Sequence, residues 1–266
     1  MTDGYRAKKS FGQHFLTDLR VARTIAELAT TPPGGTVLEI GAGLGALTTH
    51  LLARAARVVA VERDRDLVPK LIEAFAGPIA EGRLVVREAD AAQVDLVAEI
   101  MDGPHPHVVA GNLPYAITGR LVQRTVEAAG AIDGAVFMVQ KEVADRLAAH
   151  AGDDAYGALS VFTQAAFSVE RVLVVKAGAF RPPPRVDSAV VAFSPLRPPR
   201  AEETTRFREA VRRAFAARRK TLRNAWKGMY GITPEELAER AKAAGIDLDA
   251  RGETLPVEAF AAISRG

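Results

Sequence analysis

The sequence has no cysteine, which excludes several classes of chemistry at once. Disulfide bridges, cysteine-ligated zinc, iron–sulfur clusters and catalytic thiolates all require a sulfur that the chain lacks. Mechanisms in which a cysteine first adds to a pyrimidine ring are excluded for the same reason. Any reaction that the protein carries out must therefore use other side chains or a cofactor.

Long apolar runs are also absent. No stretch approaches the ~18 residues that a membrane span needs. The first residues, Met1 to Arg6, lack the apolar segment of a signal peptide. We therefore expect a cytoplasmic protein that makes no contact with a membrane.

The composition is that of an ordinary globular protein. Hydrophobic residues make up 48% and charged residues 25% of the 266 residues. At ~150 residues per domain, this length corresponds to somewhat fewer than two domains. The 35 basic and 32 acidic side chains give a net charge of only +3. The position of the basic residues along the chain is therefore more informative than their total.

Strand-like and helix-like segments alternate over most of the chain. Short apolar runs that are typical of buried strands lie at 37–40, 58–61, 84–86, 108–110 and 134–139. Two later strands are expected at 166–175 and 188–193. Helical patterns separate the earlier runs. This alternation predicts an α/β fold with a parallel, doubly wound sheet.

A proline-rich stretch, Ser194 to Arg200, is the one convincing linker. After it the pattern is helical, with an apolar stripe formed by Phe207, Val211, Phe215 and Leu222. We expect a first domain over residues 1–195 and a small all-helical domain over residues 200–266. Trp226, the only tryptophan, is expected in the core of the helical domain.

The ends of the early strands carry glycine-rich or acidic turns, and ligands of an open parallel sheet bind at these ends. The first strand runs into Gly41-Ala42-Gly43-Leu44-Gly45, whose glycines let a ligand approach the backbone. Glu62, 21 residues after Gly41, can accept both hydroxyls of a ribose. Asp90, after the third strand, can accept from an adenine amino group. The simpler interpretations are a tight turn, an exposed acid and a helix cap, respectively.

These three features fit either a nicotinamide dinucleotide or S-adenosylmethionine, because both contain adenosine. The spacing Gly-x-Gly-x-Gly differs from the Gly-x-Gly-x-x-Gly that places a pyrophosphate at a helix N-terminus. No set of residues suited to hydride transfer stands out. The pattern therefore favours methyl transfer.

The turn after the fourth strand, Asn112-Leu113-Pro114-Tyr115, is unusual for the end of a buried strand. Pro114 fixes its own φ and biases Leu113 toward an extended backbone, so the Leu113 carbonyl can face the crevice. The Asn112 side-chain oxygen provides a second acceptor next to this carbonyl, and the Tyr115 ring provides a flat surface beside them. Such a turn suits a planar base with an exocyclic amine; the simpler interpretation is a β-turn with a packed tyrosine.

This turn and the glycine turn together resemble those of the methyltransferases that act on the N6 amino group of adenine. Longer stretches resemble the ribosomal RNA adenine dimethyltransferases (the KsgA family), over about residues 6 to 265. These stretches are Lys9 to Leu16, Gln140 to Leu147 with Tyr156 to Ser160, Phe180 to Ser188, and Arg218 to Asn224. The resemblance implies a Rossmann-like class I methyltransferase sheet, mostly parallel, with a C-terminal helical domain that binds RNA.

The resemblance also implies S-adenosylmethionine as the cofactor. The residues that it assigns to this cofactor are Gln13, His14, Leu16, Gly41, Gly43, Glu62, Asp90 and Asn112. The first three would contact the methionine end, the glycines would pack against the cofactor, Glu62 would hold the ribose and Asp90 the adenine. His14 stands where many members have asparagine, although histidine also occurs.

The residues that the resemblance assigns to the target base and its reaction are Asn112, Leu113, Pro114, Tyr115 and Phe180. Asn112 and Leu113 would bind the amine, and Tyr115 and Phe180 would sandwich the base. The segment Lys176-Ala177-Gly178 before Phe180 replaces a more usual proline-containing stretch.

Basic residues gather after the linker, where acidic residues are few. Those that we expect to bind RNA phosphates are Arg212, Arg218, Arg219, Lys220 and Arg223. The simpler interpretation is a solvated helix face. The resemblance implies a substrate of two adjacent adenines in a hairpin near the 3′ end of small-subunit (16S) ribosomal RNA, and a role in small-subunit biogenesis. We expect the protein to act as a monomer.

Two other functions stay open. One is adenine methylation of large-subunit ribosomal RNA, as in macrolide resistance, against which Tyr156 to Ser160 and Pro182 to Pro184 argue. The other is a binding protein that monitors subunit assembly. His105 and His107 flank Pro106 and look like a metal pair, but no third ligand is near them in the sequence. We therefore expect an ordinary loop there and predict no metal site.

Overall fold

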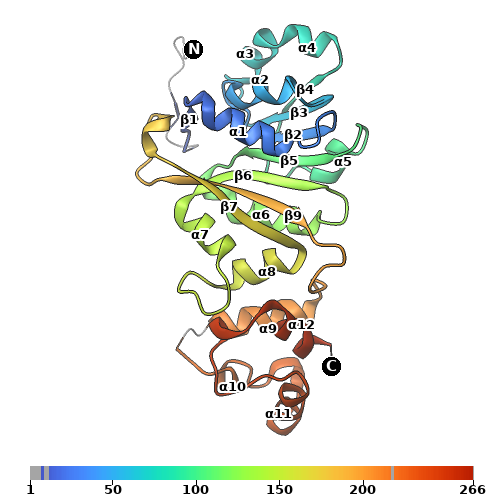
Figure 1. Ribbon diagram of the computed structural model, residues 1–266, viewed down its shortest axis with the longest axis vertical. Coiled ribbons are helices and arrows are strands. Elements are labelled where there is room, and N and C mark those ends of the chain that lie inside the picture. Colours follow the sequence, from blue (N-terminus) through green and yellow to red (C-terminus); the bar gives the residue numbers. More distant parts are fainter. Residues whose placement is uncertain (1–6, 9–11, 217–218, 266) are drawn as a thin grey trace. The chain divides into compact units, whose positions relative to one another are not determined.

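The computed structural model describes residues 7–8, 12–216 and 219–265, and the chain divides into two compact units (Figure 1). The first unit consists of Met1–Ala144 and Glu170–Pro195, and the second of Asp145–Val169 and Leu196–Gly266. The predicted boundary after residue 195 therefore coincides with one change of unit. The segment 145–169, expected in the first domain, groups with the C-terminal helices instead.

A seven-stranded sheet forms the centre of the first unit, in the order β4-β3-β2-β5-β6-β9-β7 (Figure 1). Its strands are β2 (Thr36–Ile40), β3 (Arg57–Glu62), β4 (Leu84–Glu88), β5 (His107–Asn112), β6 (Gly134–Gln140), β7 (Phe167–Val175) and β9 (Ser188–Pro195). The strands from β4 to β6 in this order pair in parallel, and β9 is antiparallel to β6. The predicted doubly wound sheet, mostly parallel, is confirmed.

The strand order reverses between β2 and β5, which are neighbours although two strands separate them in sequence. Crossover connections leave on opposite sides of such a switch point, so a crevice opens at the carboxyl ends of the two strands. β2 is buried along its whole length, as is expected for a central strand that is covered on both faces. The fold thus brings the turns after Ile40 and Asn112 to one edge of the sheet.

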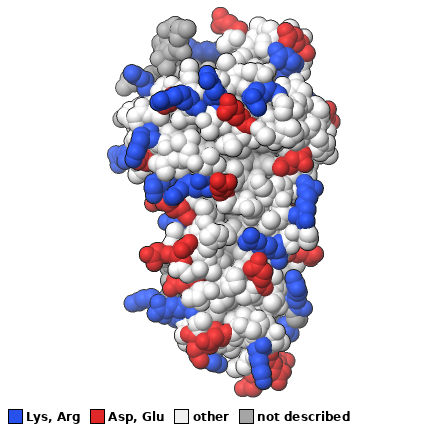
Figure 2. Space-filling view, viewed as in Figure 1, with Lys and Arg blue, Asp and Glu red and all other residues white. Residues whose placement is uncertain are grey.

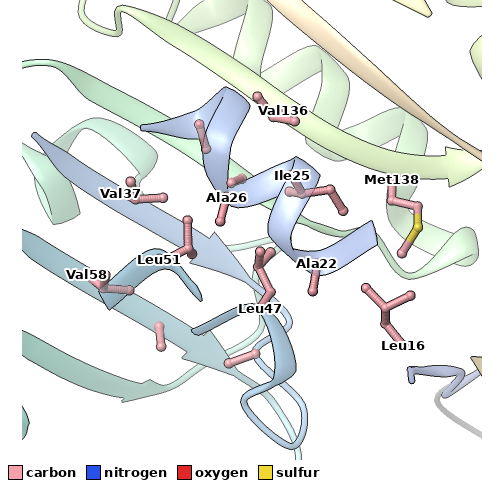
Figure 3. Close-up of a cluster of buried hydrophobic side chains, with 14 of the residues drawn as sticks. Leu16, Ala22, Ile25, Ala26, Val37, Leu47, Leu51, Val58, Val136 and Met138 are labelled. Carbon is pink, nitrogen blue, oxygen red and sulfur yellow. The ribbon is translucent and has the colours of Figure 1, made fainter. Parts of the chain in front are cut away.

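Helices cover the sheet. They are α1 (Leu19–Ala29), α2 (Ala46–Leu52), α3 (Val68–Ala74), α4 (Ala76–Ala80), α5 (Leu96–Ile100) and α6 (Thr118–Glu127). The next helix, α7 (Lys141–Ala148), begins in the first unit and ends in the second. Asp18 caps α1 by accepting a hydrogen bond from the backbone N–H of Arg20. The buried face of α1 packs with α2 and with strand side chains: Figure 3 shows Ile25 and Ala26 near Leu51 and Val136. This cluster supports the strands that end at the crevice.

A second, two-stranded sheet pairs segments far apart in sequence. β1 (Phe15–Leu16) runs antiparallel to β8 (Phe180–Arg181), with Leu16 opposite Phe180. Neither strand was predicted, because two residues are too short to show a period. The pairing ties the N-terminal segment to the loop before β9.

The second unit is helical. Its helices are α8 (Ala158–Ala166), α9 (Thr205–Ala216), α10 (Leu222–Ala225), α11 (Pro234–Ala243) and α12 (Val257–Ser264). Trp226 is fully buried and donates from Nε1 to the Ala210 carbonyl over 2.9 Å, so its prediction as a core residue is confirmed. The Tyr156 hydroxyl donates to the Leu255 carbonyl over 2.9 Å, which ties the 145–169 segment into this core. No helix in the described ranges of either unit is long and apolar enough to cross a membrane.

Candidate cofactor and target site

One cavity of about 950 Å³ opens where the central strands end. It is lined by the glycine turn after β2, by Glu62, by Asp90, by the turn from Asn112 to Tyr115 and by residues 12–17 of the N-terminal segment. Of the residues predicted for cofactor and target, Phe180 alone does not line it. The volume is at the upper end of the range for small-molecule pockets. The cavity therefore has room for a cofactor and a second flat ligand.

The glycine turn needs its glycines. Gly41 and Gly43 have φ values of 73° and 60°, a left-handed conformation that side chains with a Cβ rarely adopt. A Cβ on Gly43 would also lie 3.3 Å from the Phe15 ring. The chain passes from this turn directly into α2. Gly41 and Gly43 therefore line the cavity in a backbone conformation that any other residue would strain.

Glu62 holds the glycine turn against the end of β3. Its Oε2 accepts from the Gly43 N–H and its Oε1 from the Asp64 N–H, each over 2.8 Å. Burial raises the pKa of Glu62, and these two hydrogen bonds oppose that rise. A carboxylate has about four acceptor positions. Glu62 can therefore accept two ligand hydroxyls while it keeps its backbone donors.

Glu39 is a site residue to which the sequence assigned no role. It lines the same cavity, is fully buried in β2, and accepts from the Thr48 hydroxyl over 2.6 Å. Burial, with the nearby Glu62, raises the pKa of Glu39 to about 7, although the Thr48 hydrogen bond lowers it. The sequence feature that could have identified Glu39 is the presence of an acid inside the otherwise apolar run from Val37 to Ile40, because buried acids are rare.

Asp90 is not a helix cap, because the cap of the following helix α5 is Asp95. Its Oδ1 accepts from the Ala92 N–H over 3.0 Å, which closes a local turn. Its Oδ2 lies 3.5 Å from Nη1 of Arg63, and the residue is half-buried at the cavity wall. The local hydrogen bond and a ligand-facing carboxylate are therefore compatible.

The turn after β5 is held from two sides. Nδ2 of Asn112 donates to the His14 carbonyl over 3.1 Å, and the Leu113 N–H donates to the Met138 carbonyl over 3.0 Å. A carbonyl only accepts, so the first bond fixes the orientation of the Asn112 amide. The Oδ1 of Asn112 is then the end that remains to accept from a ligand.

Tyr115 is stacked on His14 rather than on Phe180. The two ring centroids are 5.8 Å apart with planes inclined by 29°. The Tyr115 hydroxyl and Ser188 Oγ are 3.0 Å apart, and His14 Nδ1 donates to the Pro182 carbonyl over 2.7 Å. The aromatic wall of the cavity is thus fixed in place by hydrogen bonds to the first residue of β9 and to the segment before it.

The position of Phe180 corrects a prediction. Its side chain is only 2% exposed and packs in the hydrophobic cluster with Leu16 and Val175. Successive strand residues point to opposite faces, so β8 directs Phe180 into the core while Arg181 lines the cavity. In this arrangement Phe180 supports the cavity wall and does not form one face of a base-binding sandwich.

The N-terminal segment is attached next to Glu62. Lys8 Nζ lies 2.5 Å from Oδ1 of the buried Asp64 and 2.7 Å from Oδ2 of Asp66. Gln13 Nε2 donates to the other oxygen of Asp64 over 2.8 Å, and its Oε1 accepts from the Lys8 N–H. These contacts place Gln13 and His14 at the cavity; residues 9–11 lie outside the described residues.

The predicted RNA-binding residues lie in different settings. Arg218 lies outside the described residues. Within the described part of the chain, Arg212, Arg219 and Lys220 are exposed and make no ion pair. Arg223 forms two hydrogen bonds to Asp249, at 3.0 and 3.2 Å, so a neighbouring carboxylate offsets its charge. Figure 2 likewise shows acidic side chains interspersed with basic ones over the face in view.

The residues at the cavity fit an adenosyl cofactor. A glycine turn, a buried acid at the end of β3 and a second acid after β4 line the same cavity, which suits the backbone, ribose and adenine of such a ligand. Together with the mostly parallel seven-stranded sheet and its antiparallel strand β9, they define a class I methyltransferase that uses S-adenosylmethionine.

The family follows from the sequence match. Residues 4–265 match the model of the family described as ribosomal RNA adenine dimethylase, and the chain belongs to this family. It is 42% identical to "Ribosomal RNA small subunit methyltransferase A" of Geobacter sulfurreducens, covering 99% of this chain and 96% of the relative. It is 45% identical to the protein of the same name from Anaeromyxobacter sp., covering 98% and 93%.

Solved structures agree on the fold. A dimethyladenosine transferase from Plasmodium falciparum aligns with a TM-score of 0.81 at 24% identity, covering 94% of this chain and 96% of that one. The 23S rRNA methyltransferase ErmE aligns with a TM-score of 0.71 at 27% identity, covering 94% and 98%. The protein is thus an S-adenosylmethionine-dependent ribosomal RNA adenine dimethyltransferase.

Proposed function

We propose that this enzyme dimethylates N6 of two adjacent adenines in a hairpin near the 3′ end of small-subunit ribosomal RNA, acting as a cytoplasmic monomer during small-subunit assembly. The observation that carries the proposal is that Glu62, Asp90 and the turn from Asn112 to Tyr115 line one cavity. The choice of subunit is supported by relatives of 42–45% identity that are named for the small subunit. The 23S enzyme with a solved structure is 27% identical.

The cofactor end of the cavity is formed by the glycine turn and the acids. Glu62 would accept from the ribose hydroxyls and Asp90 from the adenine amino group, with Gly41 and Gly43 against the cofactor. Gln13, His14 and Leu16 would face its methionine end, where the contacts of Lys8 and Gln13 to Asp64 hold the segment. When bound, S-adenosylmethionine supplies a methyl group on a positively charged sulfur, which is already an activated electrophile.

The target end must make the amine nucleophilic. The N6 lone pair of adenine is delocalised into the ring, so it needs help to face the methyl group. Hydrogen bonds from the amine to Asn112 Oδ1 and to the Leu113 carbonyl favour a tetrahedral nitrogen with a free lone pair. In-line positioning supplies much of the remaining rate. Once the methyl group is attached, the positively charged nitrogen would lose a proton to water, so no general base is required before the transfer.

The base must leave its stack to reach this turn, because the reacting nitrogen is otherwise not accessible. Stacking against the Tyr115 ring would return ~1–3 kcal/mol of this cost. The ring face also stabilises the positive charge that develops on the amine. The hydrogen bond to Ser188 and the His14 ring hold Tyr115 in position for this contact.

RNA outside the cavity would be held by phosphate contacts rather than by a base code. Arg212, Arg219 and Lys220 are exposed without ion pairs among the described residues, and Arg218 lies next to them in sequence. Such contacts position structured RNA and weaken as salt rises.

The decisive experiment incubates the enzyme and labelled S-adenosylmethionine with small and large subunits from cells that lack the gene, followed by mass spectrometry of the adenines. We expect dimethyladenosine at two neighbouring positions of small-subunit RNA and none in large-subunit RNA. Methylation of the large subunit instead would overturn the proposal in favour of the macrolide-resistance activity. An Asn112→Ala protein serves as the inactive control.

A further inference from the structure

A cluster of possible metal ligands lies at the opposite end of the strands from the cavity. His107 is the first residue of β5, His105 lies two residues before it, and Asp133 directly precedes β6. Their ligand atoms, one from each residue, all lie within 4.8 Å of one another. The cluster is held together by the parallel pairing of β5 and β6, in which Val108 is opposite Gly134. Asp133 also donates from its backbone N–H to the His107 carbonyl over 2.7 Å.

The tautomer of a neutral His107 ring follows from its partners. Its Nε2 lies 2.9 Å from the Gly103 carbonyl oxygen, and since a carbonyl only accepts, Nε2 carries the proton. A neutral imidazole then has its lone pair on Nδ1. This Nδ1 is buried, in a residue that is 1% exposed, and has no hydrogen-bond partner among the described residues. Buried acceptors without a partner are rare in folded proteins.

The other two residues add a charge and a second nitrogen. Oδ2 of Asp133 accepts from the His107 N–H over 2.7 Å and lies 2.8 Å from Nδ1 of His105. The two imidazole rings are stacked, with centroids 3.8 Å apart. The His105 side chain is 67% exposed, so its ring has room to turn toward a ligand. The cluster therefore combines a fixed lone pair, a carboxylate and an adjustable imidazole.

We propose that His105, His107 and Asp133 bind a first-row divalent cation, for which Zn²⁺ is the best fit. His107 supplies Nδ1, Asp133 a carboxylate oxygen and His105 a ring nitrogen, and water takes the fourth position. The Nε2–H bond to Gly103 acts as the outer contact that usually orients a metal-binding histidine. The third ligand is 26 residues from His107 in sequence, which is why no metal was predicted there.

This site joins the beginnings of two neighbouring strands, and it is separate from the methyl-transfer cavity. None of its three residues lines that cavity. A bound cation would stabilise the loop from His105 to His107 against the residue before β6. It would stabilise the folded protein by preferential binding, without a part in the reaction.

The test uses the purified full-length protein, freed of metal with a chelator, and Zn²⁺ alone. Titration calorimetry is expected to give one Zn²⁺ per chain, and Zn²⁺ is expected to raise the midpoint of thermal unfolding. His105→Ala removes an exposed ligand, and Asp133→Asn keeps an acceptor for the His107 N–H. Both should weaken Zn²⁺ binding at least tenfold and abolish the thermal shift. His150→Ala, which removes an exposed histidine elsewhere, is the matched control and should bind as the unaltered protein does.

Substitution by Co²⁺ gives an independent reading, because its visible absorption reports the ligand set. Intense bands of a four-coordinate site are expected with the unaltered protein and should be lost with His105→Ala. The proposal is overturned if the unaltered protein binds no Zn²⁺, or if both variants bind it as tightly as the control. Methyl transfer is measured separately, so failure here would leave the proposed function intact.

Discussion

The backbone N–H of Gly43 donates to Oε2 of Glu62 over 2.8 Å, so the turn after β2 and the end of β3 are one connected unit. The residue expected to hold the ribose therefore also shapes the glycine turn beneath the cofactor. Loss of its carboxylate removes a ligand contact and an anchor of the turn together. Substitution of Glu62 should accordingly reduce cofactor affinity by more than the loss of a single hydrogen bond would.

Glu62→Ala should weaken S-adenosylmethionine binding by at least about tenfold to a hundredfold, since one hydrogen bond to a charged group already contributes ~1.5–3 kcal/mol. Titration calorimetry with the cofactor measures this directly. Glu88→Ala, which removes an exposed acid at the end of β4, is the matched control and should leave affinity unchanged. Equal cofactor affinity for the Glu62 variant and the control would contradict the assignment.

Asn112→Ala should reduce methyl transfer by at least ~100-fold, because the amine loses a positioned acceptor in the transition state. RNA affinity should stay near that of the unaltered protein. Transfer of tritiated methyl groups and a filter-binding assay separate the two effects. Unchanged turnover would reject the role of Asn112.

Arg219→Glu and Lys220→Glu combined reverse two exposed cations that pair with no acid among the described residues, and this variant should bind RNA about tenfold more weakly at physiological salt. The slope of log affinity against log salt should become shallower by about one to two. Arg223→Glu should have a smaller effect, since Asp249 already pairs with Arg223. The proposed binding of RNA phosphates by Arg219 and Lys220 is refuted if the double variant binds RNA with the affinity and the salt dependence of the unaltered protein.

Phe180→Ala should destabilise the protein by about 3–5 kcal/mol, the range for removal of a large buried ring from a core. Urea denaturation gives the free energy of unfolding. Tyr115→Ala, at a half-buried ring on the cavity wall, should cost less stability and more activity. A Phe180 variant of unaltered stability would show that the ring does not belong to the core.

The buried Glu39 predicts a specific pH dependence of stability. Its pKa is raised to about 7, from a usual value of 4.5, so the folded protein holds this proton more tightly than the unfolded chain. The contribution of this proton to the free energy of unfolding is complete below pH 4.5 and is lost as the pH rises toward 7. Glu39→Gln keeps an acceptor for Thr48 and removes the titration. The stability of Glu39→Gln relative to the unaltered protein should therefore rise by up to about 3 kcal/mol between pH 4.5 and 7, measured by denaturation at each pH.

The strand runs and their polar ends were predictable because each signal is local. Val58 to Val61 and Val108 to Ala110 are apolar runs of strand length. Glu62 follows the first run directly, and Asn112 follows the second after one glycine. The parallel order of such strands then brings their ends to one edge, whatever the details of packing.

Features that depend on pairing over long distances were not predictable. Phe180 points into the core because of the register of β8 with β1. A shift of this register by one residue would turn Arg181 toward the core and Phe180 toward the cavity. The ion pair of Arg223 with Asp249 and the approach of Asp133 to His107 each join residues 26 apart. No local pattern distinguishes these partners from other acids nearby.

The division of the chain has a practical consequence for dissection of the enzyme. The segment 145–169 lies between β6 and most of β7 in sequence, yet Tyr156 and Val161 are buried among the C-terminal helices. A chain that ends at Pro195 would keep these apolar side chains and lose the neighbours that cover them. Such a fragment should aggregate rather than report on the catalytic half alone, so the contributions of the two units are better separated by point substitutions than by truncation.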